Sequence, residues 1–241
     1  MNQKTQLVST DFRIPNSLDF CKKSMEALEI ILLEITNNLR DIFEKREGIT
    51  NESLEREQFL THGFAWVATY VESLNQLLFW AENLKNEGKL NLTESLILQI
   101  GFGEYLAQIK GGIQMSQSEI IRLEQFNLCE EKLTVFNSEP IRTLITSGNS
   151  DGARKSLVEC LIQSIGLSTY CETGLDLEYD TIRSVFYRFS KDKINPYANS
   201  WHLNNELIPM SIIKELSELG VFGLTIPESF GGLGMTKTAM C

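Results

Sequence analysis

Apolar residues in the first part of the chain recur at alternating steps of four and three, the spacing that lines one face of an α-helix. The first such stripe begins at Cys21 and ends at Ile42, with charged and amide side chains between its members. Asn16 or Ser17 has the side-chain type that caps a helix start, and Gly48 is expected to stop the helix. The pattern therefore predicts one long amphipathic helix near the N-terminus.

A second long helix is predicted from about Thr50 to about Asn86, and it has two apolar stripes rather than one. The first stripe comprises Leu60, Phe64, Val67, Val71, Leu74 and Leu78, and the second comprises Trp66, Tyr70 and Leu77. Two stripes require packing on two sides, so this helix is expected to be central in a bundle.

A third helix is predicted from Asn91 to Ile109, and the pair Gly111-Gly112 is expected to break it because glycine disfavours helix interiors. The run Ser116-Gln-Ser-Glu119 then has capping-box spacing. It predicts a restarted helix through Ile120, Ile121 and Leu123.

The periodicity weakens from Asn127 to Asp151, where Pro140 and the polar, glycine-containing cluster 147–152 indicate loop. That cluster is the best candidate for a linker. A shorter helix is predicted from Ala153 to about Thr169. Strand-like alternation never extends beyond a few residues, so the predicted fold class is all-α.

The end of the chain has a different pattern. A helix through Ile212 and Leu219 is expected to end at Gly220, and the short apolar run 221–226 is cut by Pro227. The glycine-rich turn 231–234 follows, and a further helix would begin at Thr236, one turn before the last residue. We therefore expect the sequence to be truncated. We also expect a sticky tail after about residue 175, with the apolar side chains of Val221, Phe222, Leu224, Ile226, Phe230 and Leu233 left uncovered.

Composition limits the function classes. The 241 residues suffice for one large or two smaller domains, and 42% apolar with 22% charged residues is typical of globular proteins. A net charge of −10 argues against nucleic acid or an anionic membrane surface as a partner. Residues 1–15 lack the apolar segment of a signal peptide, and the most hydrophobic run, residues 30–35, is too short to span a bilayer.

The five cysteines are scattered and form no C-x-x-C pair, which predicts reduced thiols in a cytoplasmic protein. The two histidines, His62 and His202, do not fit a di-iron site of the bundle type, which needs glutamate three residues before each histidine. Phe59 and Asn199 stand there instead. Ordinary packed or surface histidines are expected, and no metal site.

Three other patterns have a structural and a functional interpretation. Gly101-Phe-Gly103 begins like a dinucleotide fingerprint, but Leu106 replaces the third glycine and no strand precedes it, so close helix packing is favoured. The turn Gly231-Gly-Leu-Gly234 could hold a phosphate, but it lacks the Lys-Ser/Thr pair of a P-loop, so a structural turn is favoured. The aromatic residues Trp66, Tyr70 and Trp80 are expected in the core rather than on a ligand platform.

The last quarter of the sequence resembles the acyl-CoA dehydrogenase family. The resemblance comprises, in order, Tyr179-Asp-Thr-Ile-Arg-Ser-Val-Phe-Tyr-Arg-Phe189, Ile194-Asn-Pro196, Ile208-Pro209, Glu218-Leu-Gly220 and Ile226-Pro-Glu-Ser-Phe-Gly-Gly-Leu-Gly234. One such motif is weak, but the ordered set is specific. It implies that residues 175–241 form the first helices of the family's N-terminal helical domain, truncated here.

The earlier part resembles the helical extension that precedes this domain in methylsuccinyl-CoA dehydrogenases, a subgroup of the family. The residues concerned are 62–74, beginning His62-Gly-Phe-Ala-Trp66, and 102–120, beginning Phe102-Gly-Glu-Tyr105. The implied organisation is an extension over residues 1–150, a connecting helix and linker over 151–174, and the dehydrogenase domain after them.

The resemblance also implies FAD, an acyl-CoA substrate, an electron-transfer flavoprotein as partner and a homo-oligomer. In the family a carboxylate removes the α-proton and the flavin accepts the β-hydride, but both the base and the flavin domain lie downstream of the Gly-Gly-Leu-Gly turn. No catalytic, cofactor-binding or metal residue is therefore assigned, and the chain alone is expected to bind no FAD and to be inactive. The alternative hypothesis is a non-catalytic helical module that binds a protein partner.

Overall fold

The computed structural model describes residues 12–45, 48–166 and 169–241, and the chain forms two compact units, Met1–Glu172 and Thr173–Cys241. Each unit is described by itself, and the label η denotes a short 3₁₀ or π helix. The first unit consists of α1 (Ser17–Glu44), α2 (Asn51–Arg56), α3 (Gln58–Asn86), α4 (Leu92–Gly111), β1 (Ile113–Gln114), β2 (Ile120–Ile121), η1 (Leu123–Phe126), α5 (Glu130–Leu133), η2 (Thr134–Asn137), α6 (Glu139–Thr143), η3 (Leu144–Gly148) and α7 (Asp151–Gln163). The second consists of α8 (Leu177–Phe189), η4 (Ser190–Ile194), α9 (Asn195–Leu203), α10 (Met210–Glu218), η5 (Val221–Gly223), η6 (Glu228–Phe230) and α11 (Lys237–Met240).

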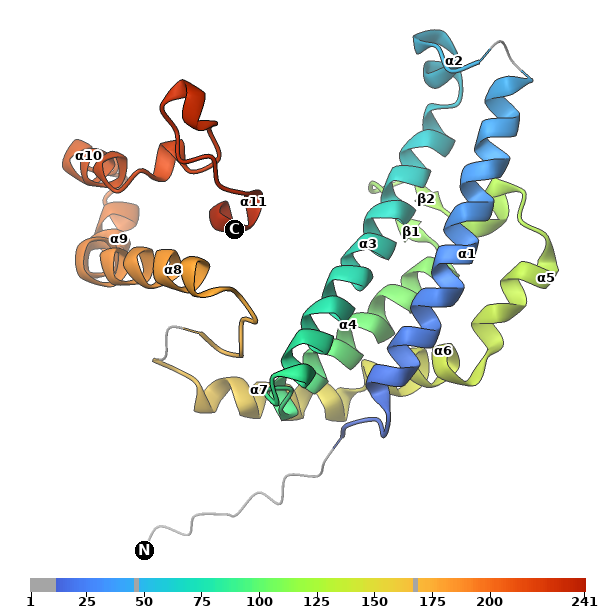
Figure 1. The fold of residues 1–241 in the computed structure, drawn as a ribbon, viewed down its shortest axis with the longest axis horizontal. Coiled ribbons are helices and arrows are strands. Elements are labelled where there is room, and N and C mark those ends of the chain that lie inside the picture. The colour runs from blue at the N-terminus through green and yellow to red at the C-terminus, as the bar shows by residue number, and fades with distance from the viewer. Residues whose placement is uncertain (1–11, 46–47, 167–168) are drawn as a thin grey trace, which may run out of the picture. The chain divides into compact units, whose positions relative to one another are not determined.

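The long helices α1, α3 and α4 pack against one another and enclose the core of the first unit (Figure 1). The buried residues of α1 include most of the stripe seen in the sequence, from Cys21 through Leu28 and Ile35 to Leu39. Burial without a charged partner raises the pKa of the Cys21 thiol, so this cysteine is a small apolar core residue. The all-α prediction is confirmed, apart from one ribbon of two short strands, each of two residues, which is described below.

Helix α3 contacts both α1 and α4, which confirms that the second predicted helix is central. Its predicted start is divided in two. Thr50 caps α2, since its hydroxyl accepts a hydrogen bond from the Ser53 amide at 3.1 Å, and the helix breaks at Glu57 before α3 begins. The third predicted helix is α4, which ends at Gly111 as expected because Gly112 has φ +117°.

The helix predicted to restart after Ser116 is wrong. Residues 113–121 form an antiparallel ribbon of β1 and β2, with Ile113 opposite Ile121. Ser116 does make the expected capping bond, accepting from the Glu119 amide at 3.2 Å, but this bond closes the turn of the ribbon. Both Ile113 and Ile121 are buried in the core, and Ile121 packs over Gly63 of α3, where a Cβ would overlap it. Burial of these two side chains outweighs the local helix signal.

The segment of weak periodicity, residues 127–151, is largely short helices, and Pro140, which indicated loop in the sequence, lies in α6. Residues 127–129, 138, 149 and 150 lie outside these helices. The turn η3 lies against α4, where a Cβ on Gly103 would lie 2.6 Å from the Leu144 carbonyl oxygen. Gly148 makes the reciprocal contact, since a Cβ on it would meet the carbonyl oxygen of Gln99. Close backbone packing, rather than flexibility, accounts for the glycine in this cluster.

The side chain of Gln99 is fully buried and joins three segments. Its amide oxygen accepts from the Ile14 amide at 2.9 Å, and its amide nitrogen donates to the carbonyls of Phe12 at 3.0 Å and Gly148 at 3.3 Å. Gln99 thus satisfies the backbone polar groups of the segment before α1 and of the end of η3.

Helix α7 packs on α4, so the segment after residue 150 belongs to the first unit. The helix is shorter than the predicted 153–169, and part of that prediction, residues 167–168, lies outside the described residues. The prediction about a signal peptide falls mostly on residues 1–11, which also lie outside them. The division between the units follows Glu172, while the family-based limits at 150 and 174 stay a prediction.

In the second unit, α10 begins after Pro209, and Gly220 follows α10 with φ +80°, as the sequence indicated. All of residues 173–241 are described, and among them only Ile212 and Leu224 are buried apolar residues. Two members of the predicted sticky set differ from the expectation, since Leu224 is buried and Val221 is half-buried. Within residues 12–45, 48–166 and 169–241, no helix has the length and apolar character needed to cross a bilayer.

Candidate functional site: an apolar hollow in the second unit

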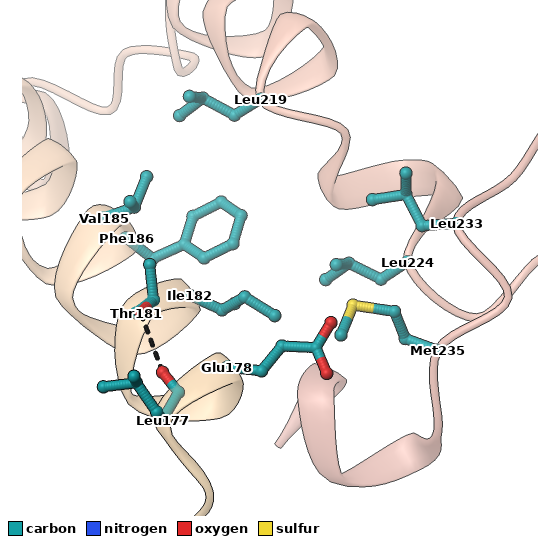
Figure 2. Close-up of a pocket in the computed structure, with 10 residues that line it drawn as sticks. All are labelled: Leu177, Glu178, Thr181, Ile182, Val185, Phe186, Leu219, Leu224, Leu233 and Met235. Atoms are coloured by element: carbon teal, nitrogen blue, oxygen red, sulfur yellow. Dashed lines mark hydrogen bonds between the residues drawn. The ribbon is translucent and has the colours of Figure 1, made fainter.

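The second unit has an apolar hollow of about 750 Å³ between α8 and the turns that follow α10 (Figure 2). Its lining residues are Leu177, Glu178, Thr181, Ile182, Val185, Phe186, Leu219, Leu224, Leu233 and Met235. Helix α8 forms one wall because Ile182, Val185 and Phe186 lie at steps of three and four on one face. The sequence predicted α8 as an amphipathic helix but gave no signal that its apolar face borders an open hollow.

Polar groups are few in this hollow. The Thr181 hydroxyl donates to the Leu177 carbonyl at 2.7 Å and is thereby used within α8. Glu178 is the one charged residue of the lining, and Figure 2 shows its carboxylate pointing towards the C-terminal turns. The surface is therefore suited to cover by apolar groups rather than to acid–base chemistry between paired residues.

The opposite wall is held by backbone hydrogen bonds in and around the glycine-rich turn. The amides of Leu233, Gly234 and Met235 donate, each at 2.8 Å, to the carbonyls of Gly223, Ile226 and Leu224, respectively. Gly232 lies so close to Ile226 that a Cβ on it would overlap that residue.

The amides of Gly231 and Gly232 are also used, since they donate to the carbonyls of Glu228 and Pro227 at 2.9 and 3.3 Å. Five successive amides of this turn are thus already paired. This pairing supports the structural interpretation of residues 231–234 and leaves no set of converging N–H groups for a phosphate.

A hydroxyl pair links the two walls. The Tyr179 hydroxyl and Thr236 Oγ1 lie 2.9 Å apart, which joins α8 to the start of α11. Thr236 occupies the N-cap position of α11, as predicted.

A second, smaller hollow of about 310 Å³ lies between α9 and α10. It is lined by apolar residues that include Trp201 and Ile212, with His202 among them, and Tyr197 stacks on Trp201 with ring centroids 5.9 Å apart. His202 thus lies on an apolar surface. In the part of the chain that the structure describes, no group of three or more His, Cys, Asp or Glu side chains is placed to hold a metal ion.

The other candidates lie in the first unit. His62 Nε2 accepts from Trp66 Nε1 at 2.9 Å, one turn along α3, so the two form a local pair. Tyr70 stacks on Tyr105 with centroids 4.5 Å apart, and its hydroxyl donates to Gln108 Oε1 at 2.7 Å. Burial raises the pKa of Tyr70, with smaller contributions from Tyr105 and Glu104. These aromatic side chains pack against the core as half-buried residues.

Neither glycine-containing segment nor the larger hollow fits the diphosphate of a flavin dinucleotide. Gly101 and Gly103 are packed against Leu77 and η3, and the amides of residues 231–235 are already paired. Among the residues that line the larger hollow there is no Lys or Arg, and its one charge is the carboxylate of Glu178. An anionic diphosphate would be repelled there.

Comparison with known proteins shows a similarity for the segment that contains both hollows. Residues 177–241 match the family model described as "Acyl-CoA dehydrogenase, N-terminal domain". Residues 177–241 are therefore similar to the N-terminal domain of acyl-CoA dehydrogenases. Both hollows lie within this acyl-CoA dehydrogenase segment, whose helices carry the ordered motifs noted in the sequence.

Individual acyl-CoA dehydrogenases extend the match. The chain is 47% identical over 192 residues to (2S)-methylsuccinyl-CoA dehydrogenase of Cereibacter sphaeroides. This match covers 80% of this chain and 34% of that protein. It is 28% identical over 90 residues to mitochondrial isobutyryl-CoA dehydrogenase of Bos taurus (37% of this chain, 20% of that protein). It is 38% identical over 64 residues to benzylmalonyl-CoA dehydrogenase of Aromatoleum aromaticum (27% and 17%). The chain thus spans about a third or less of the length of these relatives.

Proposed function

We propose that this chain is the N-terminal part of an FAD-dependent acyl-CoA dehydrogenase that forms a double bond between the α and β carbons of an acyl-CoA thioester, with methylsuccinyl-CoA as the substrate. The observation that supports this is the length of the alignment with the methylsuccinyl-CoA enzyme. At 192 residues it exceeds either compact unit, so it must run from one into the other. The benzylmalonyl-CoA match, at 64 residues, is shorter than the second unit.

The length of the match to the methylsuccinyl-CoA enzyme favours methylsuccinyl-CoA as the substrate. Similarity limited to the dehydrogenase segment supports only the general reaction, because many acyl-CoA specificities share that segment. Similarity that includes much of the helical extension is the feature shared with the methylsuccinyl-CoA enzyme. We therefore base the proposed preference for methylsuccinyl-CoA on the presence of the helical extension.

In this proposal the 241 residues supply structure rather than chemistry. The catalytic base and the residues that hold FAD would lie outside the described part of the chain, in keeping with the poor fit of its glycine turns to a diphosphate. The chain alone is then expected to bind no FAD and to be inactive. The apolar hollow beside α8 would be covered by the rest of the dehydrogenase.

The wider proposal includes an electron-transfer flavoprotein as the redox partner, a homo-oligomeric enzyme and a cytoplasmic location. The free thiols of all five cysteines support the location, since such thiols are typical of a reducing compartment.

A second function has one observation in its favour. The second unit leaves several large apolar side chains exposed, among them Phe230 at 82% and Phe222 at 60%. Such a surface also suits a non-catalytic helical module that docks on a protein partner, for example a complete homologue.

A chimeric enzyme tests the proposal. In the Cereibacter sphaeroides dehydrogenase, the aligned segment is replaced by the 192 matching residues of this chain. We expect the purified chimera to retain bound flavin and to oxidise methylsuccinyl-CoA with an artificial electron acceptor, in preference to isobutyryl-CoA. A folded chimera that retains flavin but prefers isobutyryl-CoA would contradict the substrate assignment, and one without flavin or activity would contradict the dehydrogenase assignment.

A further inference from the structure

The last residue of the first unit, Glu172, is held at both ends of its backbone. Its amide donates to Glu94 Oε1 at 2.9 Å, and its carbonyl accepts from Trp80 Nε1 at 3.2 Å. The other carboxylate oxygen of Glu94 accepts from the Asn91 amide at 3.1 Å, at the start of α4. One glutamate therefore caps a helix of the bundle and fastens the end of the unit to it.

This attachment is strong for so short a segment. Glu94 is only 3% exposed, and hydrogen bonds to a carboxylate are stronger than those between neutral groups. Releasing Glu172 would leave a buried carboxylate oxygen without a donor, which is costlier than breaking an exposed hydrogen bond.

The first residue of the second unit is also held, but by groups of its own unit. The Thr173 hydroxyl donates to Asp180 Oδ1 at 3.2 Å, on the first turns of α8, and accepts from the Leu175 amide at 3.4 Å. Asp180 also pairs with Arg183 at 3.1 Å. Gly174, with φ +64°, lies inside this hydrogen-bonded turn, so its conformation is fixed by the turn.

We propose that the chain passes from the helical extension to the dehydrogenase segment through a single-peptide joint at Glu172–Thr173. The two attached residues are neighbours, and the peptide plane between them is rigid. The Trp80 bond fastens the Glu172 carbonyl, and with it this plane, to the first unit, so the dihedral left free is φ of Thr173. The joint allows the two units to turn about one point while the chain on each side stays attached to its own unit. This inference is independent of the substrate and of the proposed activity.

Amide hydrogen exchange of the complete 241-residue chain, followed residue by residue by NMR, tests the joint. We use Glu94→Met, which has no side-chain oxygen to accept the bond, and Trp80→Phe on one side, and Thr173→Val on the other. The first two should speed exchange of the Glu172 amide about tenfold or more, because each removes a bond that restrains it. They should leave the amides of Leu175 and Asp180 unchanged. Thr173→Val should do the reverse.

Trp66→Phe is the matched control, since it also removes an indole N–H bond, but one confined to α3. It should leave exchange at Glu172 unchanged. If Glu94→Met prevents folding, Trp80→Phe supplies the same comparison. The proposal is wrong if the Glu172 amide exchanges at the unprotected rate in the parent chain. It is also wrong if a variant on either side speeds exchange equally on both sides, because the segment then opens as one piece.

Discussion

The two units show different relations between helices and a core. In the first, three long helices bury continuous stripes, and side chains such as Phe102 and Phe126 are fully enclosed. In the second, helices with regular apolar faces and the turns between them border two hollows. Only two apolar residues of this unit, Ile212 and Leu224, are buried. Helix signals thus specify the elements in both units, but apolar cover is complete in only one. The difference indicates that the first unit is stable by itself and that the second needs a covering surface.

Separating the units should give the largest effect. We expect residues 1–172 alone to unfold in one cooperative thermal transition, because most of the buried core belongs to them. Residues 173–241 alone should show low helicity and no sigmoidal transition, since burial of apolar area is the main stabilising contribution. Circular dichroism melts measure both. A sharp melt of the 173–241 piece, free and monomeric, would contradict the comparison.

Truncating one phenylalanine in each unit sharpens the comparison between the two units. Phe102→Ala should lower the free energy of unfolding by about 3–5 kcal/mol, as is typical for a fully buried phenylalanine. Phe230→Ala, at a residue that is 82% exposed, should change it by less than about 0.5 kcal/mol. Urea denaturation of the complete chain measures both values. Similar losses at the two positions would mean that Phe230 is covered in solution.

A pair of glycines on α4 tests the packing of the first unit more finely. Gly103→Ala should cost about 1–3 kcal/mol, because its Cβ would press on the backbone of η3. Gly111→Ala, on the same helix with nothing within 4 Å of a Cβ, should be neutral or stabilise by up to about 1 kcal/mol. Thermal melts of the two variants provide the measurement. A loss at Gly111 equal to that at Gly103 would contradict the contact with η3 as the cause of the loss, since helix propensity favours alanine at both positions.

The smallest effect concerns Tyr70. Its pKa is raised in the folded state, so the unfolded chain loses the proton first as the pH rises past the ordinary tyrosine value near 10. The contribution of this group to stability is then full below that pH and is lost as the pH rises through the folded pKa. Tyr70→Phe should make the free energy of unfolding less steeply dependent on pH above 10. It should also cost about 1 kcal/mol at neutral pH through the lost bond to Gln108. An unchanged pH profile would contradict the assignment.

The sequence was sufficient for the long helices because their apolar stripes and their caps indicate the same structure. Asn91 precedes α4 where predicted, and Gly112 and Gly220 follow helices with positive φ. Thr50 also caps a helix where predicted, but that helix is the short α2 and not the start of α3. It failed where a tertiary contact outweighs a local signal. The capping-box spacing at Ser116 is also compatible with a tight turn, and only the burial of two isoleucines at 113 and 121 decides between them.

The candidate site was predictable only in part. The ordered motifs predicted the dehydrogenase segment, and the paired amides of the glycine turn agree with the structural interpretation favoured from sequence. The hollow itself was not predictable, because a hydrophobic pattern specifies which face is apolar but not whether anything covers it. The roles of Glu94 and Gln99 were also missed, since their partners are backbone groups far along the chain.

The three-way attachment at Gln99 has a consequence for the order of events during synthesis. The segment before α1 is translated first, yet its backbone is satisfied by a side chain 85 residues later, which in turn bonds to Gly148 a further 49 residues on. Closing contacts between such distant residues is slow compared with forming helices. The segment before α1 therefore stays without these bonds until Gln99 has left the ribosome, and the set is complete only when Gly148 has followed, so this segment emerges before α1 but is fixed after it.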